Sequence, residues 1–317
     1  MLGIYVATVE ALRRDPDLVW MCTWQPPVFV EEFGPERVRT MPISENATLD
    51  FAVGLAAVGL RPLVDLARAA FLFTAMDPLV NQATKLRYMT GGQYGVPLTI
   101  RAMTRGGESL GAQHEHVPYA MLAQIPGLVV AVPSTADEAA GLLSTALRYP
   151  DPVVIMESPA LFAAARSWPG DTVPGLPFGR ANLVRDGRHL TIVAVGLAVR
   201  HSLAAAERLA GQGVEAAVVD VRTVAPLDVA GIAAAVGATG TALVVDEAPA
   251  PCSVASEIVA RLVTGGAVAP GRIAQLNAAA VPAPFSPALQ REVFPGPEAI
   301  ERHALALLGE PAGRSVP

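Results

Sequence analysis

Short apolar runs rich in β-branched residues alternate with longer segments of helical periodicity along the first half of the chain. Such runs are typical of strands buried on both faces, and the longer segments are typical of helices that cover a sheet. The predicted strands are 62–66, 96–101, 128–132 and 153–157. The predicted helices are 45–58, 71–89, 114–124 and 135–149, the last with Thr135 and Glu138 at the spacing of a capping box. This alternation predicts βαβ units and therefore an α/β domain with a mainly parallel sheet flanked by helices.

The same alternation resumes near residue 190 and predicts a second, smaller α/β domain. Its predicted strands are 190–195, 216–221 and 242–246, and its predicted helices are 199–211, 228–236 and 253–263. Between the two halves lies a stretch crowded with proline and glycine, which is typical of a linker. We therefore predict a first domain at 1–158, a linker at 159–189 and a second domain at 190–317.

Ligands of open parallel sheets bind beyond the carboxyl ends of the strands, so the loops at that edge are where chemistry is expected. One such place is the start of the helix at 45–58, where Ser44 precedes Glu45. In one interpretation Ser44 caps the helix and Glu45 complements the helix dipole. In the other, Glu45 is a carboxyl group held for proton exchange with a ligand nitrogen. The residues alone leave both open.

A second place is the glycine-rich loop at 105–116, which carries His114 and His116. It is either a flexible surface loop with solvated imidazoles or a mobile loop that brings a proton donor to a substrate. Phe71 and Phe73, by contrast, are of a type that most often fills the core of a helix-covered sheet.

Composition narrows the function. The net charge is −6, from 23 basic and 29 acidic residues without a basic run, which argues against nucleic acid as a partner. The two cysteines, Cys22 and Cys252, form neither a metal pattern nor a disulfide framework. No phosphate-cradling or dinucleotide-binding glycine motif occurs. Without a signal peptide or an apolar run of about 20 residues, we expect a cytoplasmic protein that does not enter a membrane.

A family resemblance changes the weight of these interpretations. Residues 41–93 read MPISENATLDFAVGLAAVGLRPLVDLARAAFLFTAMDPLVNQATKLRYMTGGQ, and further runs are GAQH at 111–114, IPGL at 125–128 and VDVRTVAPLD at 219–228. These runs resemble the β subunits of the E1 components of 2-oxo acid dehydrogenases of the pyruvate, branched-chain and acetoin types. The resemblance implies a thiamine-pyrimidine-binding domain followed by a transketolase-like C-terminal domain.

The resemblance also implies roles for particular residues. Glu45 matches the family's I-S-E glutamate, which hydrogen-bonds the aminopyrimidine ring of thiamine diphosphate, and Ile43 belongs to the same run. Phe71 matches an aromatic residue that packs on that ring. His114 matches the A-Q-H histidine, which faces the substrate. The cofactor supplies an electron sink for decarboxylation of a 2-oxo acid.

In the family, an α-type subunit binds the diphosphate and Mg²⁺ through a G-D-G motif that this chain lacks. The resemblance thus implies an α-type partner, an α₂β₂ assembly and a possible lipoyl-bearing E2 protein. It further implies a potassium ion held by backbone carbonyls. The corresponding positions are Leu98, Ala146, Leu147, Tyr149 and Asp151.

The sequence departs from the family at three places, one of which is Cys252-Ser253 in place of the usual G-G after Asp246-Glu247. Residues 19–33 lack the usual glutamate and glycines, and Arg68 begins the Arg-Ala-Ala run that replaces T-F-[DN] before Phe71. Arg68 and His116 are candidates for contact with an anionic substrate. Because of these departures, the sequence does not identify the substrate. It also does not decide whether the acyl group passes to lipoamide or to a carbonyl acceptor, as in a carboligase. Two alternatives are the C-terminal half of a split transketolase and a non-catalytic scaffold subunit.

Overall fold

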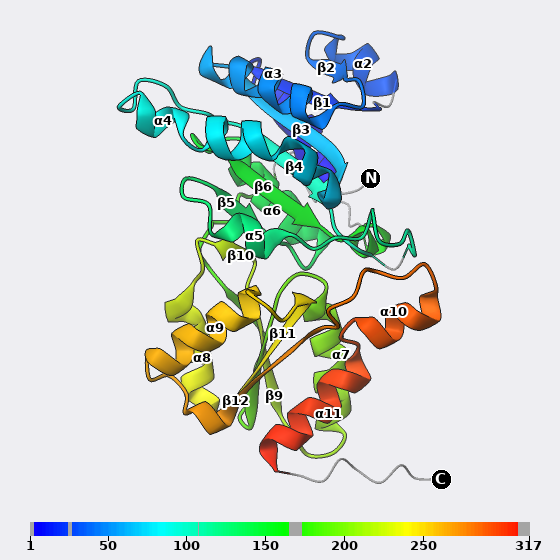
Figure 1. Ribbon diagram of the computed structural model, residues 1–317, viewed down its shortest axis with the longest axis vertical. Helices are drawn as coiled ribbons and strands as arrows, with labels where there is room; N and C mark the ends of the chain where they lie inside the picture. Colours follow the sequence, from blue (N-terminus) through cyan, green and yellow to red (C-terminus); the bar gives the residue numbers. More distant parts are fainter. Residues whose placement is uncertain (1–2, 25–26, 107, 165–172, 310–317) are drawn as a thin grey trace. The chain divides into compact units, whose positions relative to one another are not determined.

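Parallel strands form the centre of each of the two units into which the chain divides (Figure 1). The computed structural model describes residues 3–24, 27–106, 108–164 and 173–309. The first unit comprises Met1–Glu108 and Gln113–Phe178, and the second comprises Ser109–Ala112 and Gly179–Pro317. The boundary after Phe178 falls inside the predicted linker.

The strands of the N-terminal unit run in the order β5-β6-β4-β3-β1-β2 and pair in parallel. They are β1 (Leu18–Cys22), β2 (Val38–Thr40), β3 (Arg61–Arg68), β4 (Thr99–Met103), β5 (Val129–Ala131) and β6 (Val153–Glu157). Every residue of β1 and of β6 is buried, as expected for strands covered on both faces. The predicted α/β class and parallel sheet are confirmed, although β1 and β2 were not predicted.

Helices cover this sheet. They are α1 (Gly3–Arg14), α2 (Pro27–Phe33), α3 (Glu45–Ala57), α4 (Leu86–Met89), α5 (Tyr119–Ala123) and α6 (Ala136–Ala146), with shorter turns η1 (Ala69–Ala75), η2 (Pro78–Ala83) and η3 (Pro159–Ala164). Helices α1 and α6 share a core with alternate strand residues, including Leu63, Val153 and Ile155. Helix α3 packs on β3, η1 and η2, and its buried stripe includes Leu49 and Ala52.

Two predicted helices differ from the structure, and each contains a proline. The segment 71–89 is helical over most of its length but irregular, passing from the 3₁₀ turn η1 through the π turn η2 to the short α4; Pro78, which lacks an N–H, begins the π turn. The segment 114–124 is helical only over Tyr119–Ala123, because Pro118 disfavours helical conformation in the residue before it. His114 therefore lies in a turn ahead of α5.

The capping box of α6 is only half formed. The Thr135 hydroxyl accepts from the backbone N–H of Glu138 at 3.1 Å, as predicted. The Glu138 carboxylate, however, reaches one residue further back and accepts from the Ser134 backbone at 3.2 Å and from its hydroxyl at 2.9 Å. The Thr135 hydroxyl and the Glu138 carboxylate thus both accept hydrogen bonds from backbone N–H groups at the buried start of α6.

The C-terminal unit holds a second sheet of order β12-β11-β8-β9-β7. Its strands are β7 (Asn182–Arg185), β8 (Leu190–Ala194), β9 (Ala216–Asp220), β11 (Ala242–Pro249) and β12 (Ile273–Ala278), and β10 (Thr223–Ala225) follows β9. Only the pairing of β7 with β9 is antiparallel among these neighbours. The predicted strands β8, β9 and β11 are confirmed. Strand β7, which lies in the predicted linker, and strand β12 were not predicted.

The helices of this unit are α7 (Ala198–Ala210), α8 (Val229–Thr239), α9 (Val254–Thr264), α10 (Pro287–Val293) and α11 (Pro297–Leu308), with the turn η4 (Pro270–Arg272). Helices α7, α8 and α9 match their predicted ranges within three residues at each end. Asp228 and Ser253 cap α8 and α9 through their side chains. Helices α10 and α11 were not predicted.

Candidate active site

Glu45 is the first residue of α3, and its side chain is half-buried. Ser44 occupies the cap position but makes no side-chain capping bond, so the simple capping interpretation is incomplete. Thr74 Oγ1 on η1 lies 3.3 Å from Glu45 Oε2 and 2.8 Å from the Phe71 carbonyl oxygen. The single hydroxyl proton favours the shorter contact. The Glu45 carboxylate therefore keeps acceptor capacity for another donor.

Phe71 owes its position to an irregularity at the end of β3. The pairing of β3 with β4 shifts register between Asp65 and Arg68, and Ala67 adopts a left-handed conformation with φ +59°. Asp65 Oδ1 accepts from the Ala67 N–H at 3.0 Å and so stabilises this bulge. The chain then enters η1 directly, which carries Phe71 and Phe73.

The two phenylalanines of η1 meet the two histidines of the 105–116 loop. The rings of Phe71 and His114 are 5.7 Å apart at 78°, and those of Phe73 and His116 are 5.4 Å apart at 85°. Both contacts are edge-to-face, a favourable arrangement for aromatic rings. Glu45 thus lies beside η1, which carries Phe71, and the Phe71 ring contacts His114, all within the N-terminal unit.

The glycine-rich loop is packed more tightly than a freely mobile loop. A Cβ at Gly106 would lie 2.7 Å from Pro159 Cδ and 2.9 Å from the Ala160 backbone nitrogen. Arg105 and Glu115 of the same loop are 6% and 2% exposed. Gly106 is therefore required for a close approach, whereas the sequence interpretation assigned the glycines to mobility.

The remaining predicted site residues lie at the margin. The Arg68 guanidinium forms an ion pair with Glu108 of the loop, so a substrate carboxylate must displace Glu108 to reach it. His116 is exposed, with its ring against Phe73. Ile43 is 85% exposed, just ahead of α3. Its position leaves its side chain open to a ligand or a partner chain.

A buried charge cluster that the sequence interpretation missed lies at the same edge of the sheet. Arg101 on β4 donates to Asp65 on β3 and to Glu157 on β6. Burial raises the pKa of Glu157, and Arg101 only partly offsets this effect. Burial opposes the charge on Arg101, but the two carboxylates outweigh it and raise the pKa of the guanidinium. The sequence did contain a signal for this cluster, because each of the three strands carries a charged residue among apolar ones.

Cys22 ends β1 beside this cluster, and its thiol is buried. Burial, followed by the negative charge of Asp65, raises the pKa of the thiol to about 12. The group is therefore a neutral thiol at physiological pH and does not act as a nucleophile there.

The carbonyls proposed for potassium lie around the amino ends of β4 and β6. The Leu98 carbonyl accepts from the Val153 N–H at 2.9 Å, and the Ala146 carbonyl accepts from the Tyr149 N–H at 3.0 Å. The Leu147 carbonyl accepts from Arg61 Nη1 at 3.4 Å. Each carbonyl oxygen keeps a second lone pair. In the part of the chain that is described, no group of three or more His, Cys, Asp or Glu side chains is arranged to hold a metal.

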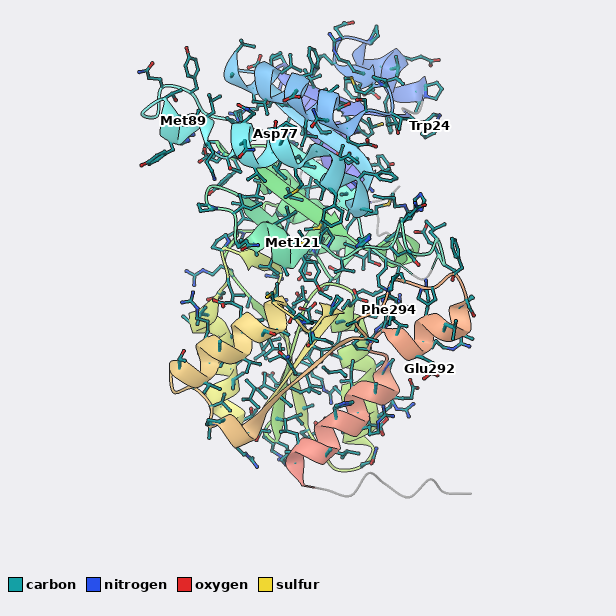
Figure 2. All side chains as sticks on the ribbon, viewed as in Figure 1. Trp24, Asp77, Met89, Met121, Glu292 and Phe294 are labelled. Carbon is teal, nitrogen blue, oxygen red and sulfur yellow. The ribbon has the colours of Figure 1, made fainter. Side chains whose placement is uncertain are left out.

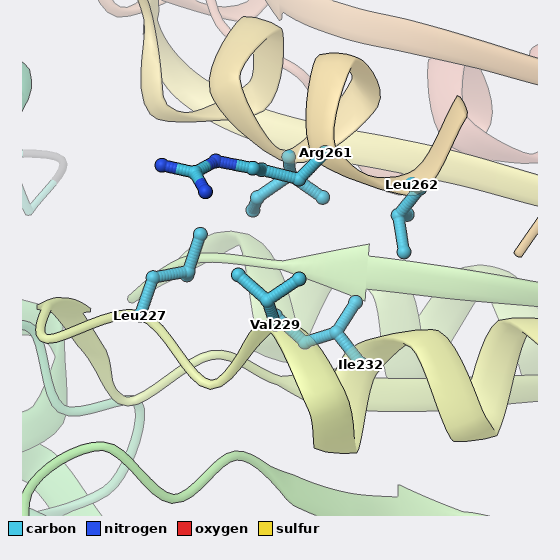
Figure 3. A pocket seen from close by; sticks show the side chains of 6 residues that line it. Leu227, Val229, Ile232, Arg261 and Leu262 are labelled. Carbon is cyan, nitrogen blue, oxygen red and sulfur yellow. The ribbon is translucent and has the colours of Figure 1, made fainter. Parts of the chain in front are cut away.

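A small depression lies between α8 and α9 in the C-terminal unit (Figure 3). Its volume is about 140 Å³, and it is lined by Leu227, Val229, Ile232, Ile258, Arg261 and Leu262. Ligand pockets are typically about 300 Å³ or larger. None of the predicted site residues lines this depression.

Large apolar side chains of the N-terminal unit face solvent. They include Ile43 (85% exposed), Phe73 (39%), Tyr88 (88%), Met89 (66%) and Tyr94 (48%). Met89 is the last residue of α4 (Figure 2).

Comparison with known proteins explains this arrangement. Residues 9–163 match the family "Transketolase, pyrimidine binding domain", and residues 179–300 match "Transketolase, C-terminal domain". The β subunit of acetoin:2,6-dichlorophenolindophenol oxidoreductase from Bacillus subtilis is 38% identical over 284 residues, which cover 89% of this chain and 83% of that protein. The chain belongs to the transketolase-like E1 β-subunit family.

Other members of the E1 β family show similar agreement. The acetoin oxidoreductase β subunit of Cupriavidus necator is 40% identical over 82% of this chain and 77% of its own. The mitochondrial pyruvate dehydrogenase E1 subunit β-1 of Arabidopsis thaliana is 36% identical over 86% of this chain and 76% of its own. The expected family and two-domain fold are confirmed.

A solved structure described as a split gene transketolase, inactive beta4 tetramer, has the same fold. It superposes with a TM-score of 0.79, at 22% identity, over 97% of both chains. Within the described residues, no helix is both long and apolar enough to cross a membrane.

Proposed function

We propose that this chain is the β-type subunit of a thiamine-diphosphate-dependent enzyme that decarboxylates a 2-oxo acid. The acyl or hydroxyalkyl group then passes to lipoamide or to a carbonyl acceptor. An α-type partner would hold the diphosphate and Mg²⁺ in an α₂β₂ assembly. The observation that carries the proposal is the gathering of Glu45, Phe71 and His114 in a pyrimidine-binding domain.

The residues of the site fit the pyrimidine end of the cofactor. A half-buried carboxylate with acceptor capacity and a half-exposed aromatic ring suit a flat, neutral heterocycle with an N–H group. No glycine-rich phosphate motif occurs in the chain. The fit therefore supports a division of the cofactor between two chains, with its charged end held by the partner.

Each residue then has a defined task. Glu45 accepts a hydrogen bond from the pyrimidine ring and exchanges a proton there. Phe71 packs on the ring and excludes water from it. His114, braced by the edge of Phe71, orients the substrate carboxylate and transfers a proton near the reacting carbon. When bound, thiamine diphosphate supplies the electron sink for decarboxylation.

The partner is supported by the exposed apolar surface. Tyr88 and Met89 on α4 and Ile43 before α3 are more than half exposed. Obligate subunit interfaces are large and apolar, and they leave such groups uncovered when a subunit is isolated. The names of the relatives, which are β subunits, support the same conclusion. Potassium at the carbonyls of Leu98 and Ala146 remains a weaker part of the proposal.

The proposal is tested with Glu45→Gln in the complex reconstituted with the α-type protein encoded nearest to this gene. We expect kcat for 2-oxo acid decarboxylation to fall by about 10²–10⁴-fold, the usual contribution of a positioned acid or base. Asp137→Asn is the matched control, because Asp137 is also a half-buried carboxylate in the first turn of a helix. If both variants retain full turnover, Glu45 only complements its helix and the chain is a scaffold.

Two further measurements refine the proposal. Calorimetry with thiamine diphosphate and Mg²⁺ is expected to show tight binding by the complex and weak or no binding by this chain alone. Product analysis with 2-oxo acids against ketose phosphates separates the proposed enzyme from a split transketolase. Analysis with lipoamide against an aldehyde then identifies the acceptor.

A further inference from the structure

Arg68 and Glu108 form a two-pronged ion pair between the end of β3 and the loop that follows β4. Arg68 Nη1 lies 2.5 Å from Glu108 Oε2, and Arg68 Nη2 lies 3.2 Å from Glu108 Oε1. The Arg68 side chain is 14% exposed and that of Glu108 is 38% exposed. A fork-to-fork pair of this kind fixes the direction of both side chains as well as their distance.

Two ring contacts follow this pair in the same order along both segments. Three residues after Arg68, Phe71 meets His114, and two residues later Phe73 meets His116. The segments 68–73 and 108–116 are thus tied at three successive points. The ring contacts are short-ranged and do not select among neighbouring registers by themselves. The directional Arg68–Glu108 ion pair, at one end of the three contacts, does select a single register.

We propose that Glu108 is a positioning residue, whose ion pair with Arg68 aligns the loop so that His114 and His116 meet the edges of Phe71 and Phe73. The proposal rests on the proposed function only where it takes His114 to face the substrate. Glu108 touches neither the cofactor nor the reacting atoms and acts through the histidines.

The bulge in β3 is what allows this alignment. Arg68 pairs in register with Met103 at the end of β4, past the shift that begins at Asp65. The guanidinium is therefore carried by a strand end that Arg101 holds through Asp65. A partly buried Arg68 side chain at this strand end loses less freedom when it binds Glu108 than a fully exposed arginine would.

The direct test is nuclear magnetic resonance of the imidazole C–H signals in the isolated full chain. The ring currents of Phe71 and Phe73 shift these signals of His114 and His116. Phe71→Leu and Phe73→Leu define the complete loss of each shift. We expect Glu108→Gln to lose most of both shifts while the fold is retained. Glu32→Gln, which removes the similar pair of Glu32 with Arg13 between α1 and α2, is expected to leave both unchanged.

A second test is turnover of the complex with the α-type partner. Glu108→Gln is expected to lower kcat about tenfold with little change in KM for the 2-oxo acid. The swapped pair, Arg68→Glu with Glu108→Arg, is expected to restore both imidazole shifts in the isolated chain. Imidazole signals of Glu108→Gln that superimpose on those of the wild type would overturn the proposal. So would a swapped pair that behaves like the sum of its single variants.

The two proposals fail separately. The imidazole shifts are measured without cofactor, substrate or partner, so they test the role of Glu108 even if the chain has no turnover. Glu45→Gln tests the proposed function and is expected to leave the imidazole shifts unchanged, because Glu45 contacts Thr74 and neither histidine ring.

Discussion

Asp65 and Arg101 face each other in register on β3 and β4, and both side chains are buried at the carboxyl edge of the sheet. On its other side Arg101 donates to Glu157 on β6. One guanidinium therefore joins the ends of three strands, two of which lead into η1 and the histidine loop. We therefore expect the geometry of the candidate site to depend on this cluster.

Arg101→Met is expected to destabilise the chain by about 3–5 kcal/mol, because it leaves Asp65 and Glu157 buried without their counter-charge. Arg61→Met, which removes the half-exposed pair with Asp15, is the control and is expected to cost about 1 kcal/mol or less. Urea unfolding followed by circular dichroism measures both. Equal losses would show that the buried cluster contributes no more than a surface pair.

The stability of the chain should decrease with rising pH because of Glu157. Its folded-state pKa is raised above the ordinary value of 4.5, so the folded state binds more protons than the unfolded state above that pH. Its favourable contribution is complete below 4.5 and is lost as pH rises through the folded pKa. Unfolding free energies of wild type and Glu157→Gln are compared from pH 4 to 8. As pH rises, the unfolding free energy of the wild type should fall relative to that of Glu157→Gln. A difference that stays constant with pH would contradict a raised pKa for Glu157.

The two cysteines should differ in reactivity. The Cys22 thiol is buried with a pKa of about 12, whereas Cys252 is exposed. A chromogenic disulfide reagent at pH 8 is expected to label one thiol in the native chain and two after denaturation, because only the thiolate reacts. Cys252→Ser should abolish the native labelling. Rapid native labelling of that variant would show that Cys22 is accessible.

Gly106 and Gly54 should respond oppositely to the same substitution. A Cβ at Gly106 would meet Pro159 and Ala160, so Gly106→Ala is expected to destabilise the chain by about 1–3 kcal/mol. Gly54 lies exposed within α3 with no neighbour inside 4 Å, so Gly54→Ala is expected to stabilise it by about 0.5–1 kcal/mol. Thermal unfolding measures both. A stabilising Gly106→Ala would mean that the loop is loosely packed.

The parts of the fold that could be predicted are those determined within a single segment. Strand β6 is a continuous apolar run, and its predicted bounds are those of the structure. The segment 71–89 is helical as predicted, but its change from 3₁₀ to π to α geometry was not predicted, because periodicity does not register the effect of Pro78. Thr74 and Arg101 could not be assigned, since their partners lie on other elements. The family resemblance indicated Glu45, Phe71 and His114, but only the structure shows that Thr74 links Glu45 to Phe71.

The bulge at Ala67 has a consequence for how this chain tolerates change. The extra residue sets the side of the sheet on which each following side chain emerges, and one residue fewer would turn Arg68 and the start of η1 to the opposite side. Replacing Ala67 with glycine leaves that count intact, whereas a deletion does not. Length, more than residue identity, is therefore what selection should preserve in the 65–68 segment.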